Sequence, residues 1–148
     1  MKKFLADWVT HYLKHKDVFT ERIEKISETE KGLLVHNKDG SEKIVLIEPF
    51  LNEFKPKLAG LEGKDIAIVV FNSRENFNAM LNDWNDIAKF EKLTIIFVNP
   101  FSMMDTKWVL SPYFHNRIAD PVSLKSGLKS IFSSVEEITK EQAEKKIK

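Results

Sequence analysis

The sequence contains no cysteine. This absence excludes disulfides, thiolate metal sites and cysteine nucleophiles, and it fits a reducing compartment. Long apolar runs are absent too, since none approaches the roughly 18 residues that a membrane-spanning helix needs. Asp7, His11 and Lys14 interrupt the N-terminal segment, so it lacks the apolar core of a signal peptide. We therefore expect a cytoplasmic protein with no membrane partner.

An excess of charge of either sign is missing, and glycine is scarce. The 23 Lys and Arg residues almost balance the 22 Asp and Glu residues, which leaves a formal net charge of +1. This balance argues against non-specific electrostatic binding to nucleic acid, although a local basic patch would still permit it. No glycine stands directly after the apolar run that ends at Phe71, so the glycine-rich turn that usually binds a nucleotide is missing. The sequence implies no cofactor.

Two short apolar runs bracket an amphipathic stretch. Residues 66–71 and 93–98 are rich in β-branched and aromatic side chains and show no polar alternation, which is typical of strands covered on both faces. Within residues 75–91, apolar side chains recur at helical spacing. These are Phe77, Met80, Leu81, Trp84, Ile87 and Ala88. Because parallel strands need a long connection, the pattern predicts a β-α-β crossover.

The remaining patterns complete an α/β architecture. We expect a helix over residues 3–15, a meander of three strands, a short helix within 49–61, an antiparallel return strand and a helix that starts at Asp120-Pro121. The three strands of the meander are 22–28, 33–37 and 43–48, and the return strand is 107–111. The predicted fold has three α/β/α layers around a mixed sheet of about five or six strands, with α+β as the alternative.

The length of the chain indicates one globular domain over residues 1–135. Residues 136–148 alternate charges around few apolar side chains, which predicts a charged tail or a frayed helix.

Polar residues follow both strands of the crossover. Asn72, Ser73 and Arg74 come after the first strand and Asn99 after the second, while Lys107 begins the return strand at the same end. Ligands of open α/β sheets bind beyond the carboxyl ends of parallel strands, and a helix N-terminus there favours an anion. These five residues are therefore the predicted anion-binding or ligand-binding site. The alternative is that Asn72 and Ser73 only cap the helix and that Arg74 is solvated.

Histidines supply two further candidates. His115 and Asp120 lie beyond the return strand, at the opposite end of the sheet, and could form an oriented acid/base pair. The alternative is that Asp120 only caps a helix that begins at Pro121. His11 and His15 have the helical spacing of two metal ligands, but no further histidine lies at a recognised spacing, and a polar helix flank is the default interpretation.

The order helix, three strands, helix, strand over residues 3–98 resembles the restriction-endonuclease-like, or PD-(D/E)XK, superfamily, with one extra strand. In that family an acid ends the second core strand and a Glu-x-Lys motif lies on the third. Glu48, in Ile-Glu-Pro, matches the first position, whereas residues 66–71 contain neither an acid nor a lysine. The resemblance therefore implies a member whose metal would be held by a single carboxylate, fewer than hard divalent cations need.

Together these patterns predict a binding or interaction module, with a catalytically inactive nuclease-like domain in a larger assembly as its specific form. Two other classes stay open. One is a metal-dependent nuclease or other hydrolase that uses Glu48, His115 with Asp120, or Ser73 with Arg74. The other is a structural subunit that buries an apolar patch in a homo-oligomer. A protein partner or a second copy of the chain is the expected partner.

Overall fold

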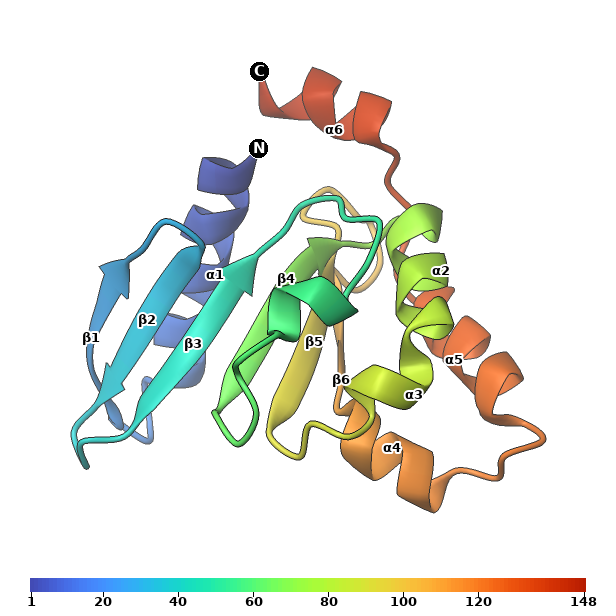
Figure 1. Cartoon of the computed structure of the whole chain (residues 1–148). Coiled ribbons are helices and arrows are strands. Elements are labelled where there is room, and N and C mark those ends of the chain that lie inside the picture. The colour runs from blue at the N-terminus through green and yellow to red at the C-terminus, as the bar shows by residue number, and fades with distance from the viewer.

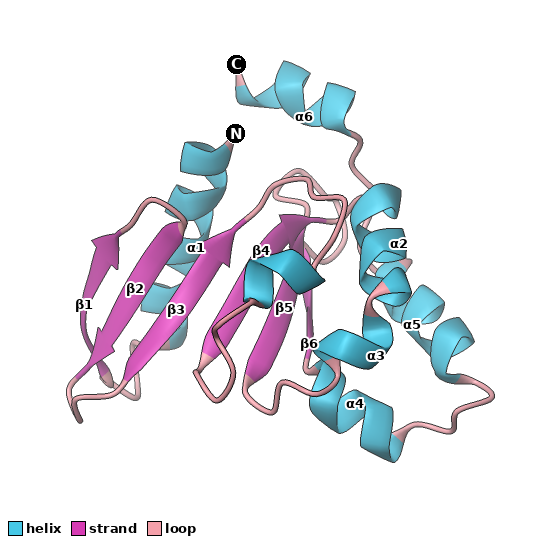
Figure 2. Cartoon of the chain, viewed as in Figure 1, coloured by secondary structure: helices cyan, strands magenta, loops and turns pink.

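The computed structural model describes all 148 residues. Six strands form one mixed sheet, and helices cover both of its faces (Figures 1 and 2). The strands are β1 (Ile23–Glu28), β2 (Gly32–Asn37), β3 (Glu42–Ile47), β4 (Ile66–Phe71), β5 (Leu93–Val98) and β6 (Lys107–Leu110). The helices are α1 (Lys2–Lys16), the 3-10 turn η1 (Lys55–Leu58), α2 (Arg74–Asn82), α3 (Trp84–Ile87), α4 (Pro112–Ile118), α5 (Leu124–Phe132) and α6 (Lys140–Ile147).

The strands lie side by side in chain order, from β1 to β6. Strands β1, β2 and β3 form an antiparallel meander, β3, β4 and β5 are parallel, and β6 returns antiparallel to β5. The predicted α/β fold, the mixed sheet and the antiparallel return strand are thus confirmed. The connection from β3 to β4 is a second parallel crossover. This crossover was not predicted, because the connection contains only the four-residue turn η1.

Strand β4 lies at the centre of the fold, and all six of its residues are buried. Ile66, Ile68 and Val70 face a core that also contains residues of η1, α2, α3 and α5. Ala67, Val69 and Phe71 face a second core under α1 and α6. This burial on both faces explains why the strand is apolar without alternation.

The helical boundaries differ from the prediction at three places. The stretch 75–91 is divided at Asp83, whose carboxylate accepts hydrogen bonds from the backbone N–H groups of Phe54 and Lys55, at 2.8 and 2.9 Å. Residues 112–118 form helix α4, and the helix expected from Asp120 begins only at Leu124. Helix α4 begins at Ser111-Pro112, a capping-type residue followed by proline at the first helical position. The same pattern at Asp120-Pro121 was predicted to begin a helix, and it does not.

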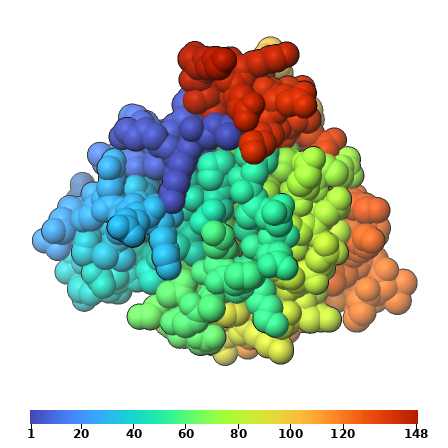
Figure 3. Space-filling view, turned by 45° about the horizontal axis from the view of Figure 1, so that its top comes forward, coloured from blue at the N-terminus to red at the C-terminus, as the bar shows by residue number.

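The C-terminal segment folds onto the rest of the molecule. Helix α6 begins with a capping box between Thr139 and Gln142. Ile138 and Ala143 are buried in the same core as residues of α1. Figure 3 shows the C-terminal segment, in red, lying against the N-terminal helix, in blue. The segment therefore contributes apolar side chains to the interior.

Candidate functional site

The carboxyl ends of β4 and β5 carry the buried side chain of Asn72. Its Nδ2 donates to the carbonyl oxygens of Val135 and Phe132, at 3.0 and 3.3 Å, and its Oδ1 accepts from the indole N–H of Trp108 at 2.8 Å. Its backbone carbonyl accepts from the N–H of Ile138 at 3.0 Å. One residue at the end of β4 thus holds the chain that leaves α5.

Asn99, at the end of β5, holds the same segment. Its Nδ2 donates to the carbonyl oxygen of Glu136 at 2.9 Å, while its Oδ1 accepts from the N–H of Phe101 at 3.1 Å. With Asn72, it places two buried amides under residues 132–138. Buried amides need partners, and here the polypeptide itself supplies them.

Arg74 reaches the same segment from the first turn of α2. Its Nε and Nη2 donate to the two carboxylate oxygens of Glu137, at 3.0 and 3.1 Å, and its guanidinium lies 5.1 Å from the centre of the Phe132 ring. Ser73 caps α2, because its hydroxyl oxygen accepts from the N–H of Asn76 at 3.1 Å. The groups expected to meet a ligand therefore meet residues of the chain itself.

Four of the five predicted site residues come together, and the fifth does not. Asn72, Ser73, Arg74 and Asn99 all lie where β4 and β5 end. Lys107 begins β6 at this end of the sheet, but its Nζ lies over the ring of Tyr12, 5.2 Å from the ring centre, on the face covered by α1.

The topology of the sheet does not produce the usual ligand crevice at this end. Strands β3, β4 and β5 are neighbours in chain order, and η1 and α2 share one core on one face of the sheet. A crevice forms where successive connections diverge to opposite faces, and these two do not. The carboxyl ends are instead crossed by residues 132–138.

Asn76, on α2, was missed by the sequence analysis. Its Oδ1 accepts from the N–H of Leu51, and its Nδ2 donates to the carbonyl oxygens of Pro49 and Phe71, at 2.9 to 3.0 Å. The side chain is fully buried. It lies in the first turn of an amphipathic helix, three and four residues before the apolar Ala79 and Met80, and this shared helical face was the available signal of such a role.

Glu48 follows β3, and its carboxylate lies 3.4 Å from Nζ of Lys57. His11 and His15 are exposed on α1. The structure contains no group of three or more His, Cys, Asp or Glu side chains arranged to hold a metal ion.

His115 and Asp120 lie at the opposite end of the sheet, on and just after α4. The His115 ring meets Trp84 edge to face at 6.1 Å, and partial burial lowers the pKa of its imidazole. The Asp120 carboxylate accepts from the N–H of Val122 at 3.2 Å. No hydrogen bond or ion pair joins His115 to Asp120.

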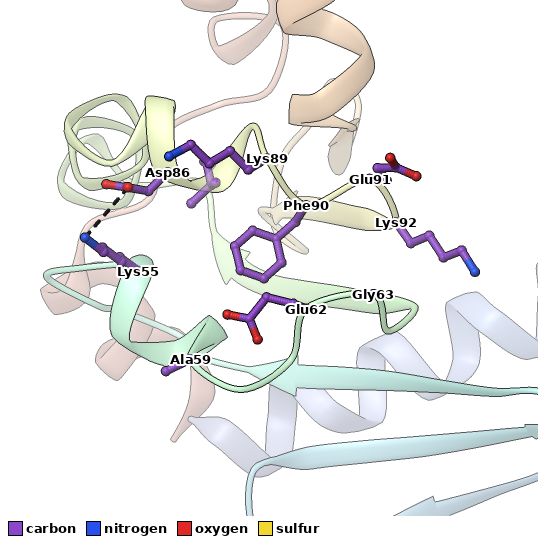
Figure 4. A pocket seen from close by; sticks show the side chains of 10 residues that line it. Lys55, Ala59, Glu62, Gly63, Asp86, Lys89, Phe90, Glu91 and Lys92 are labelled. Carbon is purple, nitrogen blue, oxygen red and sulfur yellow. Dashed lines mark ion pairs between the residues drawn. The ribbon is translucent and has the colours of Figure 1, made fainter.

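A cavity of about 730 Å³ lies at the amino ends of β4 and β5, between the loop after η1 and the loop after α3. Figure 4 shows the ring of Phe90 on the loop after α3 and the side chain of Glu62 on the loop after η1, and the ion pair of Lys55 with Asp86, at 3.7 Å, on the rim. Three lysines and three acids line it, so its charges cancel. These charged side chains are Lys55, Glu62, Asp86, Lys89, Glu91 and Lys92.

Comparisons with protein-family models, with curated proteins and with solved structures found no match to this chain. None of its helices combines the length and the apolar character that crossing a bilayer requires.

Proposed function

We propose that this protein is a binding or interaction module, and that its nuclease-like topology carries no cleavage chemistry. The observation that supports this proposal is the closure of the carboxyl ends of β4 and β5. The place where an α/β sheet usually holds its ligand is occupied by residues 132–138.

The closure is built from buried contacts. The side-chain amides of Asn72 and Asn99 donate hydrogen bonds to main-chain carbonyl oxygens of that segment, and Ile138 is buried beside them. Opening this end would exchange these hydrogen bonds for bonds to water, at a net cost of about 0.5–1.5 kcal/mol each, and would expose the apolar side chain of Ile138. The binding free energy of a ligand at this end would first have to offset the cost of moving residues 132–138 away.

The nuclease-like part of the proposal depends on Glu48. The resemblance rests on the order helix, three strands, helix, strand, and in it Glu48, which follows β3, takes the position of the family's first acid. Its nearest charged partner is Lys57, and β4 offers only apolar side chains in place of the Glu-x-Lys motif. A single carboxylate is a poor site for Mg²⁺ or Mn²⁺.

A cleavage assay tests this proposal. Plasmid DNA, single-stranded DNA and RNA are incubated with the full chain and Mg²⁺ or Mn²⁺, and compared with the Glu48→Gln variant. Glu53→Gln serves as the matched control, because Glu53 is an exposed acid in the same loop. We expect all three proteins to leave the substrates intact. Metal-dependent cleavage that Glu48→Gln abolishes and Glu53→Gln retains would overturn the proposal.

A further inference from the structure

The outer edge of β6 has unpaired backbone groups. The N–H of Asn99 donates to the carbonyl oxygen of Thr106 at 2.7 Å, which fixes the alternation of the antiparallel ladder with β5. In that register Trp108 and Leu110 bond to β5, and the peptide groups of Lys107 and Val109 face outward. No backbone or side-chain hydrogen bond reaches those outward groups, since β6 itself pairs with β5 alone. Just before β6 the same edge is occupied, because Asp105 forms an isolated parallel bridge with Val135, so the free part of the edge runs from Lys107 to Val109.

A groove lined by apolar side chains and two lysines adjoins this edge on the face covered by α1. It has a volume of about 260 Å³, and Val109, Ile96 and Tyr12 are among its lining side chains. Val109 is 47% exposed. Lys107 and Val109 share this face of the sheet, because side chains alternate along a strand.

The groove is positively charged. Lys16 and Lys43 line it, and no Asp or Glu does. Lys107 lies beside it, over the ring of Tyr12. The one acid paired to these lysines is Asp65, 3.8 Å from Lys43 and outside the lining. A partner for this surface therefore needs carboxylates as well as an apolar side chain.

From this combination we infer that the free edge of β6 binds an extended segment of a partner protein, which adds a seventh strand to the sheet. An apolar side chain of that segment enters the groove opposite Val109, and a carboxylate two residues away meets Lys107. Strand addition uses main-chain hydrogen bonds for affinity and alternate side chains for specificity. The inference rests on the proposed function and specifies its partner.

The size of the groove favours a peptide over a small ligand. Its volume lies just below the roughly 300–1,000 Å³ of small-molecule pockets, so it accommodates individual side chains. The charge favours a different protein over a second copy, because pairing two β6 edges would bring the lysines of both copies together.

The other edge of the sheet is protected. Strand β1 has a bulge between Ile23 and Lys25, and its exposed residues Glu24, Lys25 and Glu28 carry charges of both signs. Bulges and charged side chains are the usual means of preventing strand addition. Lys25 therefore provides a matched control position on an edge strand.

The test uses the ¹⁵N-labelled full chain and the synthetic peptide acetyl-Thr-Glu-Thr-Val-Thr-Glu-amide, titrated to about 1 mM. We expect amide chemical-shift changes that centre on Lys107 and Val109, and slower amide exchange at both residues. A peptide with Lys in place of each Glu should bind at least about tenfold more weakly at low salt. Lys107→Glu should weaken binding of the acidic peptide, whereas Lys25→Glu should not.

Val109→Pro is the decisive variant. Proline removes an N–H that bonds nothing within the sheet, so the fold should tolerate it, and peptide affinity should fall at least about tenfold. Val109→Thr keeps the N–H and the β-branched shape, and it should bind within about twofold of the wild type. Thermal unfolding checks that both variants are folded.

Four results would overturn the inference. They are the absence of binding at about 1 mM peptide, shifts confined to β1 or to the cavity beside Phe90, unchanged affinity in Val109→Pro, and displacement of the peptide by single-stranded DNA at lower concentration. Self-association that Val109→Pro abolishes would assign the edge to a second copy. None of these results depends on cleavage, so failure here is distinct from failure of the proposed function.

Discussion

The polar side chains at the two ends of the parallel strands differ in burial: those at the carboxyl ends are buried, and those at the amino ends are exposed to solvent. At the carboxyl ends, Asn72 and Asn99 are buried, and all their amide groups bond to the chain. At the amino ends, charged side chains surround an open cavity, and the Lys55–Asp86 pair there is exposed to solvent. Buried polar groups with every partner supplied make one end rigid and specific, whereas solvated charges leave the other end easy to alter.

Asn72→Ala should have the largest effect. The substitution leaves the Trp108 indole N–H and the Val135 carbonyl buried without their partner, and we expect a loss of about 3 kcal/mol in the free energy of unfolding. Urea unfolding of the full chain measures it. Asn78→Ala is the matched control, because Asn78 is exposed on α2. Equal losses of unfolding free energy in Asn72→Ala and Asn78→Ala would mean that the buried amide of Asn72 does not stabilise the carboxyl end, which would contradict the contrast between the ends.

Asn76→Ala should have the next largest effect, about 2 kcal/mol. The side chain fixes the loop after β3 to the end of β4 through three hydrogen bonds, and alanine leaves the Leu51 N–H without an acceptor. Hydrogen exchange should show faster exchange at Leu51 in this variant. If the Leu51 amide stayed as protected as in the wild type, the loop would be held by other contacts.

The strands were predictable because their signal is local. Strands β4 and β5 are each six residues long and covered on both faces, and this requires a run of apolar residues. Such a run can be recognised from those six residues alone. Asn72 was placed correctly at the end of β4, yet its partners lie about sixty residues away, at Phe132 and Val135. No periodicity encodes such a pairing.

The C-terminal segment shows the same limit. Its charges dominate the pattern over residues 136–148, and among its few apolar residues two, Ile138 and Ala143, are buried in the core, while Ile147 packs against it. Two apolar side chains give no detectable stripe. The hydrogen bonds of Asn72 and Asn99 bring the chain back over the sheet, and these are tertiary contacts.

Arg74→Ala tests the exposed part of the carboxyl end, and its effect should be about 0.5 kcal/mol. Both side chains of the Arg74–Glu137 pair are about half exposed, and solvent-exposed pairs typically contribute about 0.2–1 kcal/mol. The loss should shrink at about 1 M salt, where screening is strong. Arg74→Lys should recover part of it, since lysine cannot form the paired contacts. A loss as large as that of Asn72→Ala would mean that the charges, not the buried amides, hold the segment.

The smallest effect belongs to the amino end, at His115. Burial lowers the pKa of its imidazole below the ordinary 6.5, so the unfolded chain takes up a proton more readily than the folded one. Its contribution to the free energy of unfolding is therefore complete above pH 6.5 and declines as the pH falls toward the lower pKa of the folded state. Replacing the ring with an uncharged side chain should remove this dependence. Urea unfolding at pH 8 and pH 5 should show a smaller decrease for His115→Gln than for the wild type, while His11→Gln, at an exposed position, should match the wild type. Identical decreases in all three proteins would show that the partial burial of His115 is not coupled to folding.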